Sequence, residues 1–355
     1  MRILYITRHF NHSGYLVLEK LIEEKFNIVG IVLHKDSNRW RNRYFRPFLT
    51  LLYNLSCSFY SAERLKTTDS EESIAKKNQI PILWTKSIKS DAFFDRLKSI
   101  NPDIIVLGGG WHELLPERVF NFPSLGCINT HPSLLPEFRG TSITRWQVLH
   151  GLRRSGSTIH YVDDNFDTGG ALAQKKISIP IGTTPQKLFF MLGEVGAEIM
   201  VELLRSFEAN GRQTPFRVEH NADHYEYFKK WQWSEERLII DWAQSFYDIY
   251  HFVLANTQES YKYLGPLLIL NSNKYFIREV TIREALEHVP NATNKETNVF
   301  VNSIDDDGTI WLYRAGELHY LGIKKLQKFD RFYKFRRARM ARKQLKLKVL
   351  DLVVD

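Results

Sequence analysis

The sequence predicts an α/β protein: an open doubly wound (Rossmann-like) domain over residues 1–208, then a smaller C-terminal β domain and a basic tail. In the first part, strand-like and helix-like segments alternate, and one segment, residues 103–108, is apolar as in a buried parallel strand. Beyond residue 236, short strand-like pieces are separated by Gly and Asp. A chain of 355 residues is long enough for two domains.

The elements of the first part are predicted from hydrophobic periodicity. Residues 14–25 carry apolar side chains at helical spacing, and Pro81 marks its segment as an edge strand because proline cannot donate to a ladder. Ligands of doubly wound sheets bind where strands end, so the ends of these strands are where we expect a site. Strands are expected at residues 3–6, 28–33, 80–84, 103–108 and 126–129, and helices at 14–25 and 91–99.

The second part begins after residues 209–235, which are polar and aromatic and are interpreted as a linker. Its short strands predict a small β-barrel or sandwich over residues 236–323, and residues 324–355 a basic tail, helical over 324–348. A helix is expected at residues 239–255, and strands at 267–270, 275–277, 299–301, 309–312 and 318–321.

The formal net charge of +9 is concentrated in the tail. Residues 324–348 hold twelve Lys or Arg and one acidic residue, which is +11, so the rest of the chain is near −2. A second cluster, residues 35–46, alternates basic and aromatic side chains. Both segments could contact RNA phosphates or an anionic membrane surface, and the alternative for both is a solvated surface segment.

Other features restrict the class of protein. No apolar run is long enough for a transmembrane helix, and residues 1–8 are interpreted as a first strand rather than a signal peptide. The two cysteines, Cys57 and Cys127, give neither a disulfide framework nor metal-ligand spacing. We therefore expect a cytoplasmic protein without a metal centre.

The most informative motif is NTHPSLLPEFRG at residues 129–140, followed by DTGG at 167–170. Asn129 and His131 are two residues apart, so on an extended segment they share a face. Pro132 and Pro136 then turn the chain, which leaves this pair at a strand end. With Asp167, the motif combines a hydrogen-bond donor, a titratable base and an orienting carboxylate, which is suited to acyl transfer.

This motif resembles the family that transfers a formyl group from N10-formyltetrahydrofolate to an amine, which includes glycinamide ribonucleotide transformylase, methionyl-tRNA formyltransferase and the sugar N-formyltransferases. The resemblance runs over residues 102–180 and more loosely over 1–208, and includes the strings at 102–106, 114–116 and 157–163. The spacing of 36 residues from His131 to Asp167 also agrees. The resemblance implies a formyltransferase with this folate as co-substrate and no metal.

The resemblance also implies roles. Asn129 would donate to the formyl oxygen, His131 would take the amine proton or, if protonated, stabilise the intermediate, and Asp167 would orient His131. His160 is interpreted as a structural or supporting histidine, and residues 108–110 as a loop that admits the folate. Cofactor contacts are expected at Glu113, Leu114, Leu115, Asp163, Asp164 and Asn165, and substrate contacts at Arg139, Gly140 and Thr141.

The amine acceptor is predicted to be an amino-sugar nucleotide of surface polysaccharide synthesis. Methionyl-tRNA formyltransferase is the alternative: the basic cluster 35–46, the join at 234–242 and the barrel-like end favour it. Residues 255–266 lack the usual proline-rich turn, and the cluster lacks glycine-lysine character. The first loop, residues 8–14, departs from the phosphate loop of glycinamide ribonucleotide transformylase. A formyltetrahydrofolate hydrolase and a homodimer both stay open.

Overall fold

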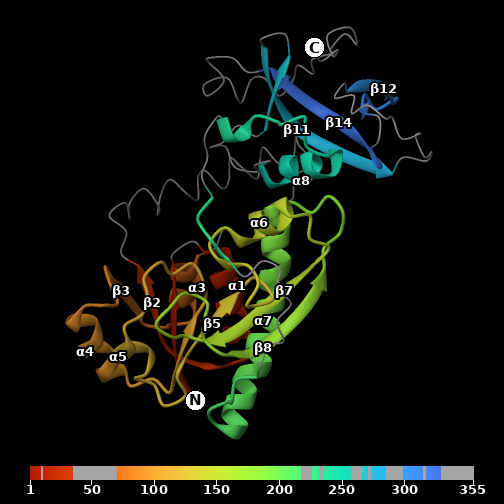
Figure 1. Ribbon diagram of the computed structural model, residues 1–355. Helices are drawn as coiled ribbons and strands as arrows, with labels where there is room; N and C mark the ends of the chain where they lie inside the picture. The colour runs from red at the N-terminus through yellow and green to blue at the C-terminus, as the bar shows by residue number, and fades with distance from the viewer. Residues whose placement is uncertain are drawn as a thin grey trace.

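The computed structural model describes residues 1–8, 11–34, 70–216, 226–231, 236–256, 266–270, 273–284, 299–314 and 317–328. These residues form an N-terminal α/β part and a C-terminal antiparallel sheet, which lie end to end (Figure 1). None of the helices in these ranges is long and apolar enough to cross a membrane.

The α/β part is built on a seven-stranded sheet in the order β3-β2-β1-β4-β5-β7-β8. The first five strands are parallel, and β7 and β8 join them antiparallel. The chain order reverses between β1 and β4, which confirms the doubly wound prediction, and β3 lies at the edge as Pro81 predicted. The strands are β1 (Arg2–Thr7), β2 (Asn27–His34), β3 (Ile82–Thr85), β4 (Ile104–Leu107), β5 (Cys127–His131), β7 (Arg154–Tyr161) and β8 (Ala171–Ser178).

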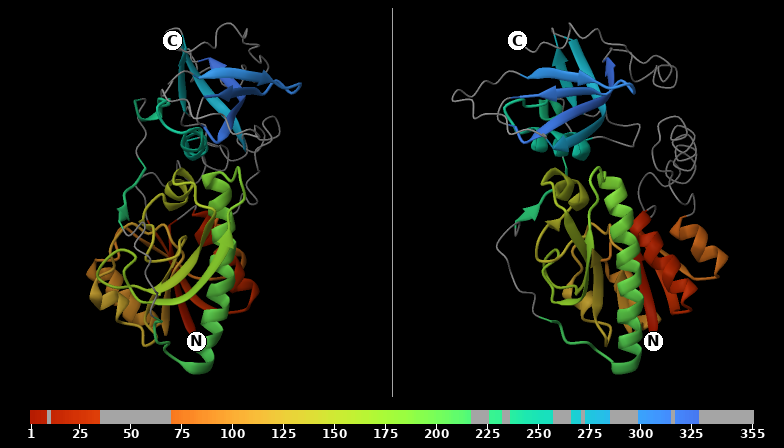
Figure 2. Two further views of the ribbon diagram at one scale, coloured as in Figure 1. Left: turned by 45° about the vertical axis from the view of Figure 1, so that its right-hand side comes forward. Right: turned by 90° about the vertical axis from the view of Figure 1, so that its right-hand side faces the viewer.

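Helices cover both faces of this sheet, and strand alternation decides which side chains meet them (Figure 2). Ile3 and Tyr5 of β1 point to the face covered by α1 and α7, whereas Leu4 and Ile6 point to the face covered by α4 and α5. Each buried Leu or Ile contributes roughly 1.5–3 kcal/mol, so these two layers hold the sheet rigid. The helices are α1 (His12–Glu23), α3 (Glu71–Lys77), α4 (Asp91–Ile100), α5 (Glu117–Phe120), α6 (Ile143–Leu149) and α7 (Pro185–Asn210).

The C-terminal part is an antiparallel sheet in the order β10-β11-β14-β13-β12, with the helix α8 (Phe246–Asn256) packed against it. In the described ranges the outer strands β10 and β12 form no ladder with each other, so the predicted barrel is not confirmed. The strands are β10 (Leu267–Leu270), β11 (Asn273–Glu284), β12 (Phe300–Ile304), β13 (Ile310–Tyr313) and β14 (His319–Lys328).

The boundaries differ from the predicted ones in several places. The helix predicted at residues 239–255 begins only at Phe246, and the strand predicted at residues 275–277 runs from Asn273 to Glu284. Strand β14 continues to Lys328, so residues 324–328 of the predicted helical tail are strand. Within the predicted linker, β9 (Tyr227–Phe228) pairs in parallel with β6 (Arg139–Gly140) of the α/β part. The cluster 35–46 and residues 329–355 lie outside the described residues. The division into domains stays a prediction.

The two parts also share a hydrophobic cluster. Leu188 and Leu192, near the start of α7, are fully buried in the same cluster as Phe246 and Val253 of α8. Helix α7 begins there because the Thr184 side chain accepts from Lys187 N and proline follows at the first helical position. The C-terminal sheet is therefore packed onto the α/β part through α6, α7 and α8.

Candidate active site

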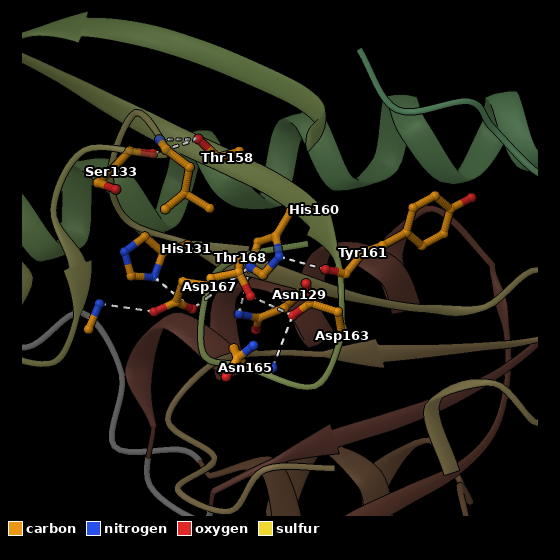
Figure 3. Close-up of polar contacts among 12 residues, drawn as sticks. Asn129, His131, Ser133, Thr158, His160, Tyr161, Asp163, Asn165, Asp167 and Thr168 are labelled. Carbon is orange, nitrogen blue, oxygen red and sulfur yellow. Dashed lines mark hydrogen bonds and ion pairs between the residues drawn. The ribbon is translucent and has the colours of Figure 1, made fainter. Parts of the chain in front are cut away.

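Asn129 and His131 lie at the carboxyl end of β5, beside β4, where the sequence predicted a site. Asp167 comes from the loop between β7 and β8 and has a positive φ of 58°, in the left-handed region that Asp tolerates better than most residues. Figure 3 shows the three side chains converging, with His160 of β7 beside them. The structure therefore brings the three predicted catalytic residues together.

His131 is held between two acceptors. Its Nδ1 lies 3.4 Å from Asp167 Oδ1, and its Nε2 lies 2.8 Å from the carbonyl oxygen of Phe138. A neutral imidazole has one N–H, so only the protonated ring donates to both. Burial opposes that charge, but the Asp167 carboxylate and the Phe138 carbonyl outweigh it and raise the pKa of His131 above its ordinary value.

Asp167 is the anion of this pair. Its Oδ2 accepts a hydrogen bond from the backbone N–H of Gly140 at 3.0 Å. Burial on its own would raise the pKa of the carboxyl, but the charge and hydrogen bond of His131, with smaller effects from His160 and Gly140, lower it to about 2. Asp167 is therefore ionised throughout the physiological pH range.

Asn129 is oriented by a residue that the sequence did not assign to the site. His160 Nδ1 lies 2.7 Å from the Tyr161 carbonyl and must donate to it, which leaves Nε2 as an acceptor. Asn129 Nδ2 lies 3.2 Å from that Nε2 and donates one amide hydrogen to it. Among the contacts of the described residues, the other amide hydrogen of Asn129 has no acceptor, so it can donate to a ligand oxygen.

His160 is neutral in this arrangement. It is 2% exposed, and burial, with the nearby charge of His131, lowers its pKa although Asp167 at 3.8 Å opposes the change. It sits directly across the β5–β7 ladder from Asn129. The signals in the sequence were its place in the string at 157–163 and its position on the strand that enters the Asp167 loop.

The predicted cofactor residues have different environments. The Glu113 carboxylate accepts from Ser87 Oγ and Ile88 N, so this side chain secures a neighbouring loop. Leu115 is buried in the core cluster beneath α4 and α5, and Leu114 is half-buried. Asp163 accepts from Asn165 N and Thr168 Oγ1, so it shapes the loop that carries Asp167. Asp164 and Asn165 lie on the same loop, and both are exposed.

The predicted substrate residues lie next to the catalytic group. Gly140 donates its N–H to Asp167, and Thr141 donates its N–H to the Phe228 carbonyl at 2.9 Å. A Cβ at Gly140 would lie 2.2 Å from the Phe228 carbonyl oxygen, so only glycine allows this approach. Arg139 is half-buried beside Gly140 on β6.

Comparisons with known proteins agree with this geometry. Residues 57–204 match the formyl transferase family, and this range contains Asn129, His131 and Asp167. The chain is 41% identical over 136 residues to a methionyl-tRNA formyltransferase of Syntrophus aciditrophicus, covering 38% of this chain and 43% of that protein. It is 36% identical over 210 residues to a methionyl-tRNA formyltransferase of Lachnospira eligens, covering 59% of each protein. The chain thus spans about half the length of these curated relatives.

A solved structure shows the same fold. It is an N-formyltransferase from Helicobacter canadensis in complex with folinic acid and dTDP-3-aminofucose. The two structures superpose with a TM-score of 0.60 at 16% identity, over 93% of this chain and 100% of that one. Such a likeness establishes the fold alone.

The sequence relatives overturn the predicted acceptor. Curated relatives at 29–41% identity are methionyl-tRNA formyltransferases, so the prediction of an amino-sugar nucleotide and of surface polysaccharide synthesis is wrong. That prediction relied on features missing from residues 35–46 and 255–266, and nearly all of these residues lie outside the described part of the chain. Missing loop features are weak signals because loops vary more than the elements that they connect.

Proposed function

The chain belongs to the formyl transferase family, and on this premise we propose that it transfers the formyl group of N10-formyltetrahydrofolate to the amino group of methionyl-tRNA. The observation that carries the proposal is the convergence of Asn129, His131 and Asp167 at the carboxyl end of β5. The names of the curated relatives favour the tRNA acceptor.

The oxyanion is assigned to Asn129 in this proposal. The amine nitrogen attacks the formyl carbon, a C–N bond forms, and negative charge develops on the formyl oxygen. The amide hydrogen that His160 leaves available on Asn129 is a preoriented donor for this oxygen. A donor that is already aligned needs no reorganisation as the charge appears, and such a donor is typically worth about 10²–10³ in kcat.

Proton transfer is assigned to the His131–Asp167 pair. The attacking amine loses one proton and N10 of the folate gains one as its bond to the formyl carbon breaks, so the pair relays a proton without consuming it. In its cationic form His131 also stabilises the oxyanion, and Asp167, with a pKa of about 2, stays ionised to stabilise that cation.

The folate and the tRNA are assigned to different parts of the chain. Backbone groups around residues 113–115 and the loop at 163–167 are proposed to hold the pterin, because both flank the strand ends at which the catalytic residues lie. The basic segments 35–46 and 324–348 are proposed to contact tRNA phosphates, which makes binding weaken as salt rises. We also propose that the protein acts in the cytoplasm.

The test is a formyl-transfer assay on the full chain. N10-formyltetrahydrofolate is supplied with methionyl-tRNA, with an amino-sugar nucleotide, or with no acceptor, and both the folate product and the formylated acceptor are measured. Formylmethionyl-tRNA formed in step with tetrahydrofolate is the expected result. Formate release without an acceptor would instead identify a hydrolase, and turnover only with the sugar would refute the tRNA acceptor.

A further inference from the structure

The described segment at residues 226–231, in the predicted linker, returns to the α/β part before the chain enters the C-terminal sheet. Its strand β9 runs parallel to β6, with Arg139 opposite Tyr227 and Gly140 opposite Phe228. Figure 2 shows β9 as a short blue-green arrow at the margin of the α/β part. The segment is also anchored at α6, because Trp146 Nε1 donates to the Lys229 carbonyl at 3.0 Å and Trp231 N donates to Ser142 Oγ at 3.2 Å.

The two side chains of β9 face in opposite directions. Tyr227 is exposed, whereas Phe228 is 4% exposed in a small cluster with Phe138 and Ile143. The Phe228 ring is stacked on Phe138 with centroids 4.8 Å apart and planes 12° apart. The backbones are equally close, since Thr141 N donates to the Phe228 carbonyl. Phe228 therefore holds residues 138–141 by both its ring and its backbone.

Residues 138–141 supply the backbone groups that hold the catalytic pair. The Phe138 carbonyl accepts from His131 Nε2, and the Gly140 N–H donates to Asp167 Oδ2. The segment that bears these two groups follows the turn after β5 and lies on the loop side of the sheet. Its conformation depends on what packs against it, which is β9 together with Ile143 and His150 of the α6 region.

We infer that β9 is a positioning element of the active site. Phe228 packs against residues 138–141, so that the Phe138 carbonyl and the Gly140 N–H keep His131 and Asp167 in position. Among the contacts of the described residues, none joins Phe228 to His131 or Asp167, so Phe228 acts through Phe138 and Gly140. The same chain continues into α8 and the C-terminal sheet, so the connection between the two parts runs directly past the catalytic pair. The catalytic readout of this inference rests on the proposed function, whereas its spectroscopic readout does not.

The test compares Phe228→Leu with Phe26→Leu in the full chain. Phe26 is also buried, at 7% exposed, but precedes β2 at the opposite end of the sheet. The ring protons of His131 are followed by NMR against pH and assigned by their loss in a His131→Ala variant. The titration midpoint of His131 depends on the Phe138 carbonyl and on Asp167, while His160 is the other titratable group beside it.

We expect Phe228→Leu to lower the titration midpoint of His131, whereas Phe26→Leu leaves it unchanged. With methionyl-tRNA as acceptor, kcat of Phe228→Leu should fall at least about tenfold with KM for the folate within about twofold, because sub-ångström displacement of catalytic groups costs rate rather than binding. Trp146→Phe, which removes the bond to the Lys229 carbonyl and keeps an aromatic ring beside Phe228, should give a smaller change in the same direction.

Each failure has a distinct signature. If the wild-type chain formylates methionyl-tRNA but Phe228→Leu leaves the His131 titration and kcat unchanged, the positioning inference is wrong and the proposed function stands. If the wild-type chain does not formylate methionyl-tRNA, the proposed function fails, and the His131 titration still decides the role of β9. Should Phe228→Leu fail to fold, the milder Trp146→Phe variant must show the shift, and an unchanged titration in it refutes the inference.

Discussion

Replacing Asp167 by Asn tests the central claim about the site, because this change removes the charge and leaves the shape. The pKa of the Asp167 carboxyl is lowered from 3.8 to about 2 in the folded protein, and the side chain is 11% exposed, so solvent screens it little. At about 1.4 kcal/mol for each tenfold change in an ionisation constant, the site favours the carboxylate by about 2.5 kcal/mol.

The preference for the Asp167 carboxylate comes mainly from His131, whose charge is the largest cause that lowers the pKa of Asp167. By linkage, removing the carboxylate destabilises the His131 cation by a similar free energy, and about 2.5 kcal/mol corresponds to roughly 60-fold in rate if the cation is needed in the transition state. We therefore expect Asp167→Asn to lower kcat roughly 60-fold or more at neutral pH. The Asn oxygen can still accept from the Gly140 N–H, so KM for the folate should change little.

The assay is the initial rate of tetrahydrofolate release at saturating methionyl-tRNA, measured from pH 6 to pH 9, with NMR titration of His131 on the same samples. Asp95→Asn is the matched control, since Asp95 is an exposed carboxylate on α4 that pairs only with Lys98 among the described contacts. A kcat within about threefold of wild type, or a His131 titration that does not move, would refute the claim that the carboxylate stabilises the cation.

Four further outcomes are expected. Asn129→Ala should lower kcat by about 10²–10³ with KM for the folate nearly unchanged, and a change in KM alone would refute its role as oxyanion donor. His160→Gln should keep more activity than His160→Asn, because only the longer amide can accept from Asn129 where Nε2 does, and equal losses would contradict the tautomer assignment. Because the pKa of His131 is raised in the folded protein, the Asp167–His131 interaction stabilises the fold below pH 6.5, and this stabilisation is lost as pH rises through the folded pKa. The difference in melting temperature between wild type and Asp167→Asn should therefore shrink toward alkaline pH. Leu192→Ala should cost about 2–5 kcal/mol and lower the melting of both parts together, and two separated transitions in calorimetry would show that the cluster does not couple them.

The doubly wound fold and the grouping of Asn129, His131 and Asp167 could be predicted because both have local signatures. Strand alternation placed Ile3 and Leu4 on opposite faces of one sheet, and a proline placed β3 at the edge. Asn129 and His131 are two residues apart on a strand that ends in a proline-bearing turn, so their common direction follows from the period of a strand. The acceptor was predicted wrongly from loop features that such periodicity does not determine.

The remaining features of the site depend on tertiary structure. His160 meets Asn129 only because β7 joins β5 antiparallel in one register, and a shift of one residue would turn His160 to the other face. The Phe138 carbonyl and the Gly140 N–H are backbone groups, which every residue carries, so the side-chain sequence did not mark them as partners of His131 and Asp167. Strand β9 comes from a segment that was interpreted as a linker, because two residues are too short to show a strand pattern. The sequence by itself determined which residues are candidates for the chemistry, and the packing of distant segments decided how they are held, because backbone contacts and strand register are properties of the assembled chain.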